Sequence, residues 1–133
     1  MSRWMTRLCL VAGSADALTG ALLLASPALT LGLMGIGTVP AEPVFLRFVG
    51  VFVGAVGLSY LLPFAGDPAR RATRLRTVLE VTALVRACVA VFVALAIASG
   101  SLALAWASVA VTDAALALVQ ISMLRASPAG ALA

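Results

Sequence analysis

The sequence contains no histidine and no lysine, and it has only two cysteines, Cys9 and Cys88. Histidine and cysteine are the main ligands of zinc, haem iron and iron–sulfur clusters, so their shortage argues against a metal site, and we expect no cofactor. Without histidine, neither a Ser–His nor a Cys–His pair can form, which argues against nucleophilic catalysis. Both cysteines have apolar neighbours and lie at different predicted depths, so we expect small buried hydrophobic residues and no disulfide.

Charge is also scarce. Charged residues are 11% of the 133 residues, hydrophobic residues are 63%, and the mean hydropathy is +1.16. Such values are typical of an integral membrane protein and not of a soluble domain. Four apolar stretches are long enough to cross a hydrocarbon core about 30 Å thick: residues 8–26, 43–64, 77–99 and 102–124. We predict one all-α transmembrane domain over residues 1–133, an antiparallel four-helix bundle with no nucleic-acid partner.

All nine basic residues are arginines, and their positions predict the orientation of the chain. Seven lie outside the spans' interiors: Arg3 and Arg7 before the first span, Arg70, Arg71, Arg74 and Arg76 between the second and third, and Arg125 after the fourth. Because basic residues are retained on the cytoplasmic side, both termini should be cytoplasmic. The apolar connection over residues 27–42 should lie along the outer interface. A cleaved signal peptide is the alternative for the first span, but Asp16 within it argues against cleavage.

Every predicted span carries an ionisable residue, and a lone charge at the bilayer centre costs about 2.5 to 3.5 kcal/mol. These residues are Asp16, Arg47, Glu80, Arg86 and Asp113. Counted from the cytoplasmic ends, Asp16, Arg86 and Asp113 fall near the midplane, so we predict that Arg86 bridges the two carboxylates. Glu80 has a nearer partner in Arg76, one helical turn earlier.

Helical periodicity predicts which faces look inward. In the second span one stripe contains Arg47, Gly50, Gly54 and Gly57, and its small residues should allow close helix packing. The first span has a similar stripe of Ala12, Gly13, Asp16, Thr19 and Gly20. In the fourth span Trp106, Asp113 and Gln120 recur every seven residues on one surface. Trp106 has two interpretations, an interface anchor or a stacking platform.

The stretch "RFVGVFVGAVGLSYLL" follows "SPALTLGLMGIG" and precedes a basic loop and a span with an arginine in its middle. In these features the chain resembles the small four-helix bacterial membrane proteins of the DoxX-like group and neighbouring families of unknown function. The resemblance covers residues 8–124 and implies the fold and a location in the bacterial cytoplasmic (inner) membrane, as a multi-pass protein. It implies no activity, and it marks Arg47 and Arg86 only as shared features.

Three functions remain open. The first is a carrier or accessory subunit that binds a small lipophilic or anionic molecule, or relays protons, through Asp16, Arg86 and Asp113, with Arg47, Glu80, Trp106 and Gln120 as further ligand-binding residues. The second is an acid–base enzyme on a lipophilic substrate, such as an isomerase, an epoxide-opening enzyme or a cyclase, with Asp16, Arg86 and Asp113 as catalytic residues. The third is a structural subunit, in a homo-oligomer or a larger membrane complex, whose charges only fix helix register.

The orientation can be tested by cysteine-accessibility labelling. A cysteine at Gly37 should react from outside the cell, and a cysteine at Thr73 only from the cytoplasm, because Thr73 lies among four arginines. The reverse labelling pattern would show that the chain is inserted the other way round.

Overall fold

The computed structural model describes residues 3–37 and 39–126, and its regular elements are all helical. The long helices are α1 (Arg3–Ala25), α3 (Pro43–Leu61), α4 (Arg71–Ala98) and α5 (Ala107–Ala126). The short ones are α2 (Pro27–Leu33) and the 3₁₀ turns η1 (Leu62–Phe64), η2 (Pro68–Arg70) and η3 (Leu104–Trp106). Four helical segments are apolar and long enough to cross a membrane: Arg3–Ala25, Pro43–Phe64, Pro68–Ala98 and Leu104–Ala126.

Two of these segments extend well beyond the spans predicted from hydropathy. Helix α1 begins at Arg3 and α4 at Arg71, whereas the predicted spans begin at residues 8 and 77. Hydropathy falls where arginines begin, but arginine is a good helix former, so the backbone hydrogen bonds continue through the charged ends. At both places the helix is therefore longer than the apolar segment.

The ends of the helices follow local rules. Pro27 cannot continue α1 because it has no backbone N–H, and it becomes the first residue of α2. Helix α2 ends at Leu33, and the chain then turns at Gly35, whose φ of 76° lets the Ile36 N–H donate to the Leu31 carbonyl at 2.8 Å. Helix α4 ends at Ala98 and is followed by a similar turn at Gly100, also with a φ of 76°. Part of the connection predicted to lie at the outer interface is thus a short helix.

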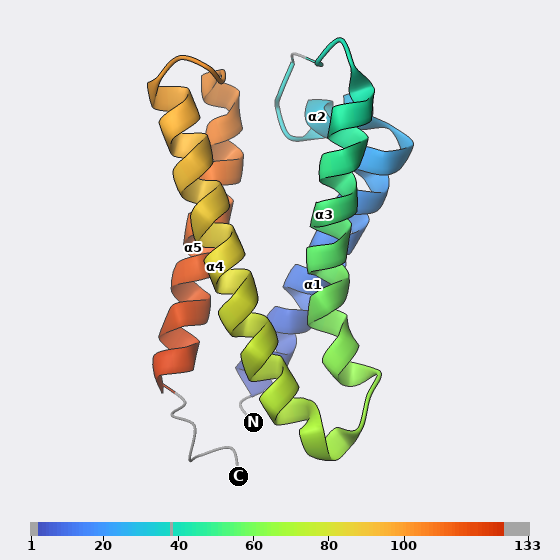
Figure 1. The fold of residues 1–133 in the computed structure, drawn as a ribbon, viewed down its shortest axis with the longest axis vertical. Coiled ribbons are helices and arrows are strands. Elements are labelled where there is room, and N and C mark those ends of the chain that lie inside the picture. Colours follow the sequence, from blue (N-terminus) through green and yellow to red (C-terminus); the bar gives the residue numbers. More distant parts are fainter. Residues whose placement is uncertain (1–2, 38, 127–133) are drawn as a thin grey trace. The chain divides into compact units, whose positions relative to one another are not determined.

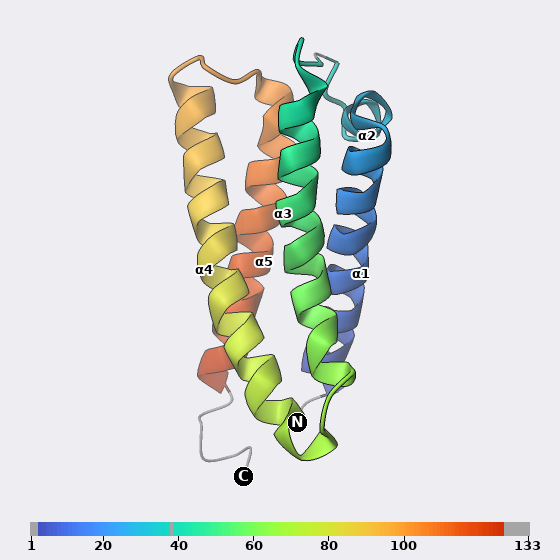
Figure 2. The same cartoon turned by 45° about the vertical axis from the view of Figure 1, so that its right-hand side comes forward.

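The chain forms two compact units, Met1–Leu75 and Arg76–Ala133, and the boundary falls within α4. In the first unit, α1 and α3 pack side by side and antiparallel, joined through α2 (Figures 1 and 2). In the second unit, α4 and α5 form an antiparallel hairpin around the short turn at Gly100 (Figure 1).

Glycines on both helices make the contact between α1 and α3 very close. A Cβ atom built on Gly13 would lie 2.7 Å from Tyr60 Cβ, and one built on Gly20 would lie 2.7 Å from the Gly50 carbonyl oxygen. From the other side, a Cβ on Gly50 would lie 2.8 Å from Leu23 Cβ. Because these distances are shorter than real Cβ contacts, no residue larger than glycine fits without moving a helix.

The members of the predicted glycine stripe of α3 differ in how closely they approach α1. Gly50 and Gly57 are buried, whereas Gly54 is half-buried and Arg47 is exposed. Arg47 is three residues before Gly50, about 60° away around the helix axis, which is enough to turn its side chain off the contact. A Cβ on Gly54 would find its nearest neighbour, Gly20 Cα, at 3.8 Å, an ordinary van der Waals distance.

This difference gives a test with a control one helical turn away. In Gly57→Ala the new methyl would meet the Ala17 backbone nitrogen and lie 2.7 Å from the Gly13 carbonyl oxygen, and backbone atoms cannot turn aside. We expect a loss of about 1 to 3 kcal/mol in the free energy of unfolding. Gly54→Ala should cost nothing and gain up to about 1 kcal/mol of helix propensity. Thermal unfolding in detergent would measure both, and equal melting temperatures would contradict the packing described.

Candidate functional site

The second unit contains an ion pair between two of its helices. Arg86 Nη1 on α4 donates a hydrogen bond to Asp113 Oδ1 on α5, with 2.5 Å between the two atoms. The side chains are 6% and 16% exposed, respectively. The pair predicted from the sequence is therefore present, and it joins residues that are 27 positions apart in the chain.

The position of Arg86 follows from the periodicity of α4. Buried residues recur along one face of the helix at intervals of three and four: Leu79, Thr82, Ala83, Arg86, Ala90 and Val93. Arg86 lies in the middle of this face, where an unpaired guanidinium would be very costly. Its neighbours one turn away on the face, Ala83 and Ala90, are small and leave room for the long arginine side chain.

The polar groups near Arg86 on its own helix are few and already engaged. The Thr82 hydroxyl donates to the Val78 carbonyl at 2.7 Å, a bond within the helix. On α5, the residue one turn beyond Asp113 is the buried Ala117. The ion pair is thus largely removed from water, and the attraction between opposite charges is stronger there than in water.

The contact uses only one oxygen of the carboxylate. An ionised carboxylate can accept several hydrogen bonds through its two oxygens, and the contact to Arg86 engages Oδ1 of Asp113. Arginine, by contrast, keeps its charge at every physiological pH. The pair therefore combines a permanent cation with a carboxylate.

The predicted pairing of Glu80 is also confirmed. Arg76 Nε donates to Glu80 Oε1 at 2.9 Å, and the side chains are 27% and 50% exposed. Such a local pair near solvent contributes little to stability, because water screens it and two long side chains must be ordered. Glu80 is thus an exposed partner of Arg76 and does not belong to the buried charges.

The other residues predicted for the site differ in burial and in the helix that carries them. Gln120 is fully buried on α5, seven residues after Asp113. Trp106 is half-buried in η3, and Arg47 is exposed on α3. Asp16 is half-buried on α1, in the first unit, so its predicted bridge to Arg86 stays a prediction.

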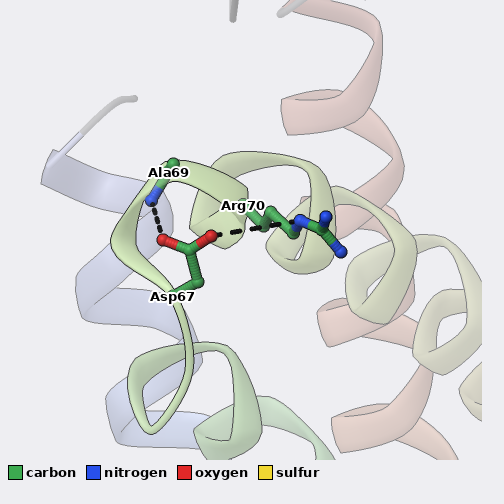
Figure 3. A network of polar contacts seen from close by, with 3 residues as sticks. All are labelled: Asp67, Ala69 and Arg70. Carbon is green, nitrogen blue, oxygen red and sulfur yellow. Dashed lines mark hydrogen bonds and ion pairs between the residues drawn. The ribbon is translucent and has the colours of Figure 1, made fainter.

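Sequence reasoning missed the detailed structure of the turn between α3 and α4. Asp67 caps η2, because its Oδ1 accepts a hydrogen bond from the Ala69 N–H at 2.9 Å (Figure 3). The Asp67–Pro68 dipeptide is a known turn-initiating signal and would have revealed this cap. In the part of the chain that the structure describes, no group of three or more histidine, cysteine, aspartate or glutamate side chains could hold a metal ion.

No protein family, curated protein or solved structure matches this chain. The chemistry of the site is therefore argued from its own residues.

The energetic role of the ion pair can be measured with a matched control on the same helix. In Arg86→Met, Asp113 loses its hydrogen-bonded partner in an apolar hairpin, and we expect a loss of about 3 to 5 kcal/mol. The double variant Arg86→Met/Asp113→Leu should recover most of this loss, since packed apolar residues can replace a buried ion pair. Removing the exposed pair through Arg76→Met should cost less than about 1 kcal/mol. An Arg86→Met protein as stable as the parent from pH 5 to 8 would contradict a buried carboxylate partner.

Proposed function

We propose that this chain is a multi-pass protein of the bacterial cytoplasmic membrane, a four-helix antiparallel bundle with both termini in the cytoplasm. The four long apolar helices support membrane insertion. The positions of the basic residues within each unit support the orientation. In the first unit, Arg3 and Arg7 begin α1, and Arg70 follows α3, at the same end of an antiparallel pair. In the second unit, Arg76 and Arg125 likewise share one end.

We further propose that the protein is a carrier for a small anionic or lipophilic anionic molecule, and that the Arg86–Asp113 pair is its binding centre. The single observation that carries this proposal is the buried arginine that donates a hydrogen bond to a carboxylate on the neighbouring helix. Ionisable residues inside a membrane mark transport routes. It is costly to remove such residues from water, so a chain that keeps them there has a use for them.

The same pair supports coupling of the anion to a proton. When Asp113 is ionised it occupies the Arg86 guanidinium and excludes other anions. When Asp113 takes up a proton, the ion pair is lost and Arg86 still carries its charge. A substrate carboxylate or other anion can then replace Asp113 on the guanidinium. Anion and proton would therefore bind together and be released together.

A structural role is the second candidate. Helices α1 and α3 are closely packed through their glycines, and a buried ion pair can serve only to fix the register of two helices. The two candidates differ in what the apolar double variant does. If the pair is structural, Arg86→Met/Asp113→Leu should retain everything the parent does. If the pair is a binding centre, the double variant should fold and lose transport.

Transport can be tested in proteoliposomes that contain a trapped pH-sensitive dye. We would apply an inward gradient of p-toluenesulfonate, a lipophilic anion that does not protonate, or of chloride. We expect the lumen to acidify faster with the parent protein than in empty vesicles, because protons enter with the anion. Asp113→Asn should bind the anion without moving protons, since a neutral amide imitates the protonated acid.

The folded double variant Arg86→Met/Asp113→Leu is the inactive control, and Arg76→Met should transport like the parent. Parent vesicles that acidify no faster than empty ones with either anion would contradict the carrier proposal. Equal acidification by the parent and the double variant would place transport at another site.

A further inference from the structure

The turn between α3 and α4 in the first unit has an excess of positive charge that its own acid does not neutralise. Between Phe64 and Leu75 it carries Arg70, Arg71 and Arg74 against a single carboxylate, Asp67. That carboxylate is already engaged. Its Oδ1 accepts the Ala69 N–H at 2.9 Å, and its Oδ2 lies 3.9 Å from Arg70 Nε (Figure 3).

Arg71 and Arg74 are each held against the turn by a contact that is not an ion pair. The Arg71 guanidinium lies over the Phe64 ring, 5.7 Å from its centroid. Arg71 Nε is buried and has no hydrogen-bond partner in the described chain. The Arg74 guanidinium packs against Gly66, where a Cβ atom would collide with Nη1. Gly66 therefore makes room for this arginine.

These two guanidinium groups are three residues apart at the start of α4, so their side chains leave the helix on neighbouring positions of one face. Among residues 3–37 and 39–126, neither group forms an ion pair with an acidic side chain. Two like charges at this spacing repel each other, and an anion between them would remove the repulsion. A phosphate group fits best, because it offers several oxygens to planar arginine forks.

The surroundings of the turn favour a phosphate that carries acyl chains. Leu62, at the start of η1, is 65% exposed beside this basic turn. Leu62 lies two residues before Phe64, the ring that Arg71 covers, so an exposed apolar side chain and a basic turn follow each other along the chain, which matches an amphiphile with an acyl chain and an anionic headgroup. A free phosphate ion would make no use of the exposed leucine.

We propose that Arg71 and Arg74 bind the phosphate of an anionic phospholipid headgroup at the α3–α4 turn. This inference relies on the membrane location proposed above, but not on the carrier activity. It differs from the general retention of basic residues on the cytoplasmic side, because it depends on two particular arginines and on the Gly66 position that accommodates one of them.

Native mass spectrometry of the protein in detergent would test this site with phosphatidylglycerol, phosphatidylcholine and inorganic phosphate as probes. We expect phosphatidylglycerol to bind at least about tenfold more tightly than phosphatidylcholine. Arg71→Gln and Arg74→Gln should each weaken phosphatidylglycerol binding by about tenfold. Gly66→Ala should also weaken it, although it removes no charge, because the methyl displaces the Arg74 guanidinium.

Arg125→Gln is the control, because it removes the same charge from an exposed position at the end of α5. It should keep the parent affinity to within about twofold. An equal loss in Arg125→Gln would overturn the site, since attraction by net charge alone would then suffice. Full affinity in the Arg71, Arg74 or Gly66 variant would overturn it too, as would inorganic phosphate that competes as well as the lipid. Extraction of membranes with alkaline carbonate tests the membrane location separately, and a chain that it removes would contradict that location. A chain that stays in the membrane but shows no lipid preference would contradict only this inference.

Discussion

A guanidinium within an apolar helix needs a carboxylate, and this requirement determines how the second hairpin is built. Arg86 lies in the centre of the buried face of α4, and Asp113 on α5 supplies the partner. The pairing fixes the register of the two helices, since a shift of one turn would move the carboxylate about 5.4 Å away. It also puts a proton-binding group and a permanent cation next to each other, which is the basis of the proposed carrier function.

The two units are stabilised in different ways. In the first, four glycines allow the two backbones to approach so closely that a methyl group does not fit: Gly13, Gly20, Gly50 and Gly57. Such packing draws its energy from many weak contacts and requires no charge. In the second, a strong polar contact joins the two helices in a region where their side chains are mostly buried. Substitution of a small residue should therefore damage the first unit, and removal of a charge the second.

Much of this arrangement could be predicted from the sequence, because it depends on rules of short range. Hydropathy located the four long helices, and spacing of three or four residues gave the Arg76–Glu80 pair. The depth of Arg86 and Asp113 along their helices was sufficient to pair them. The features that the sequence did not reveal depend on small rotations around a helix axis or on side-chain conformation. Arg47 is turned off the glycine face, Gly54 leaves room for a methyl, and Arg71 lies over Phe64.

The short turn at Gly100 has a consequence for how the chain enters a bilayer. Arg86 and Asp113 are separated by only 27 residues, and the intervening segment reverses direction through a glycine with a φ of 76°. Inserted alone, α4 would carry an uncompensated arginine into lipid at a cost of about 2.5 to 3.5 kcal/mol. Inserted as a hairpin, α4 and α5 bring both charges in together as a neutral pair. In the membrane that we propose for this chain, the two helices should leave the translocation channel as one unit.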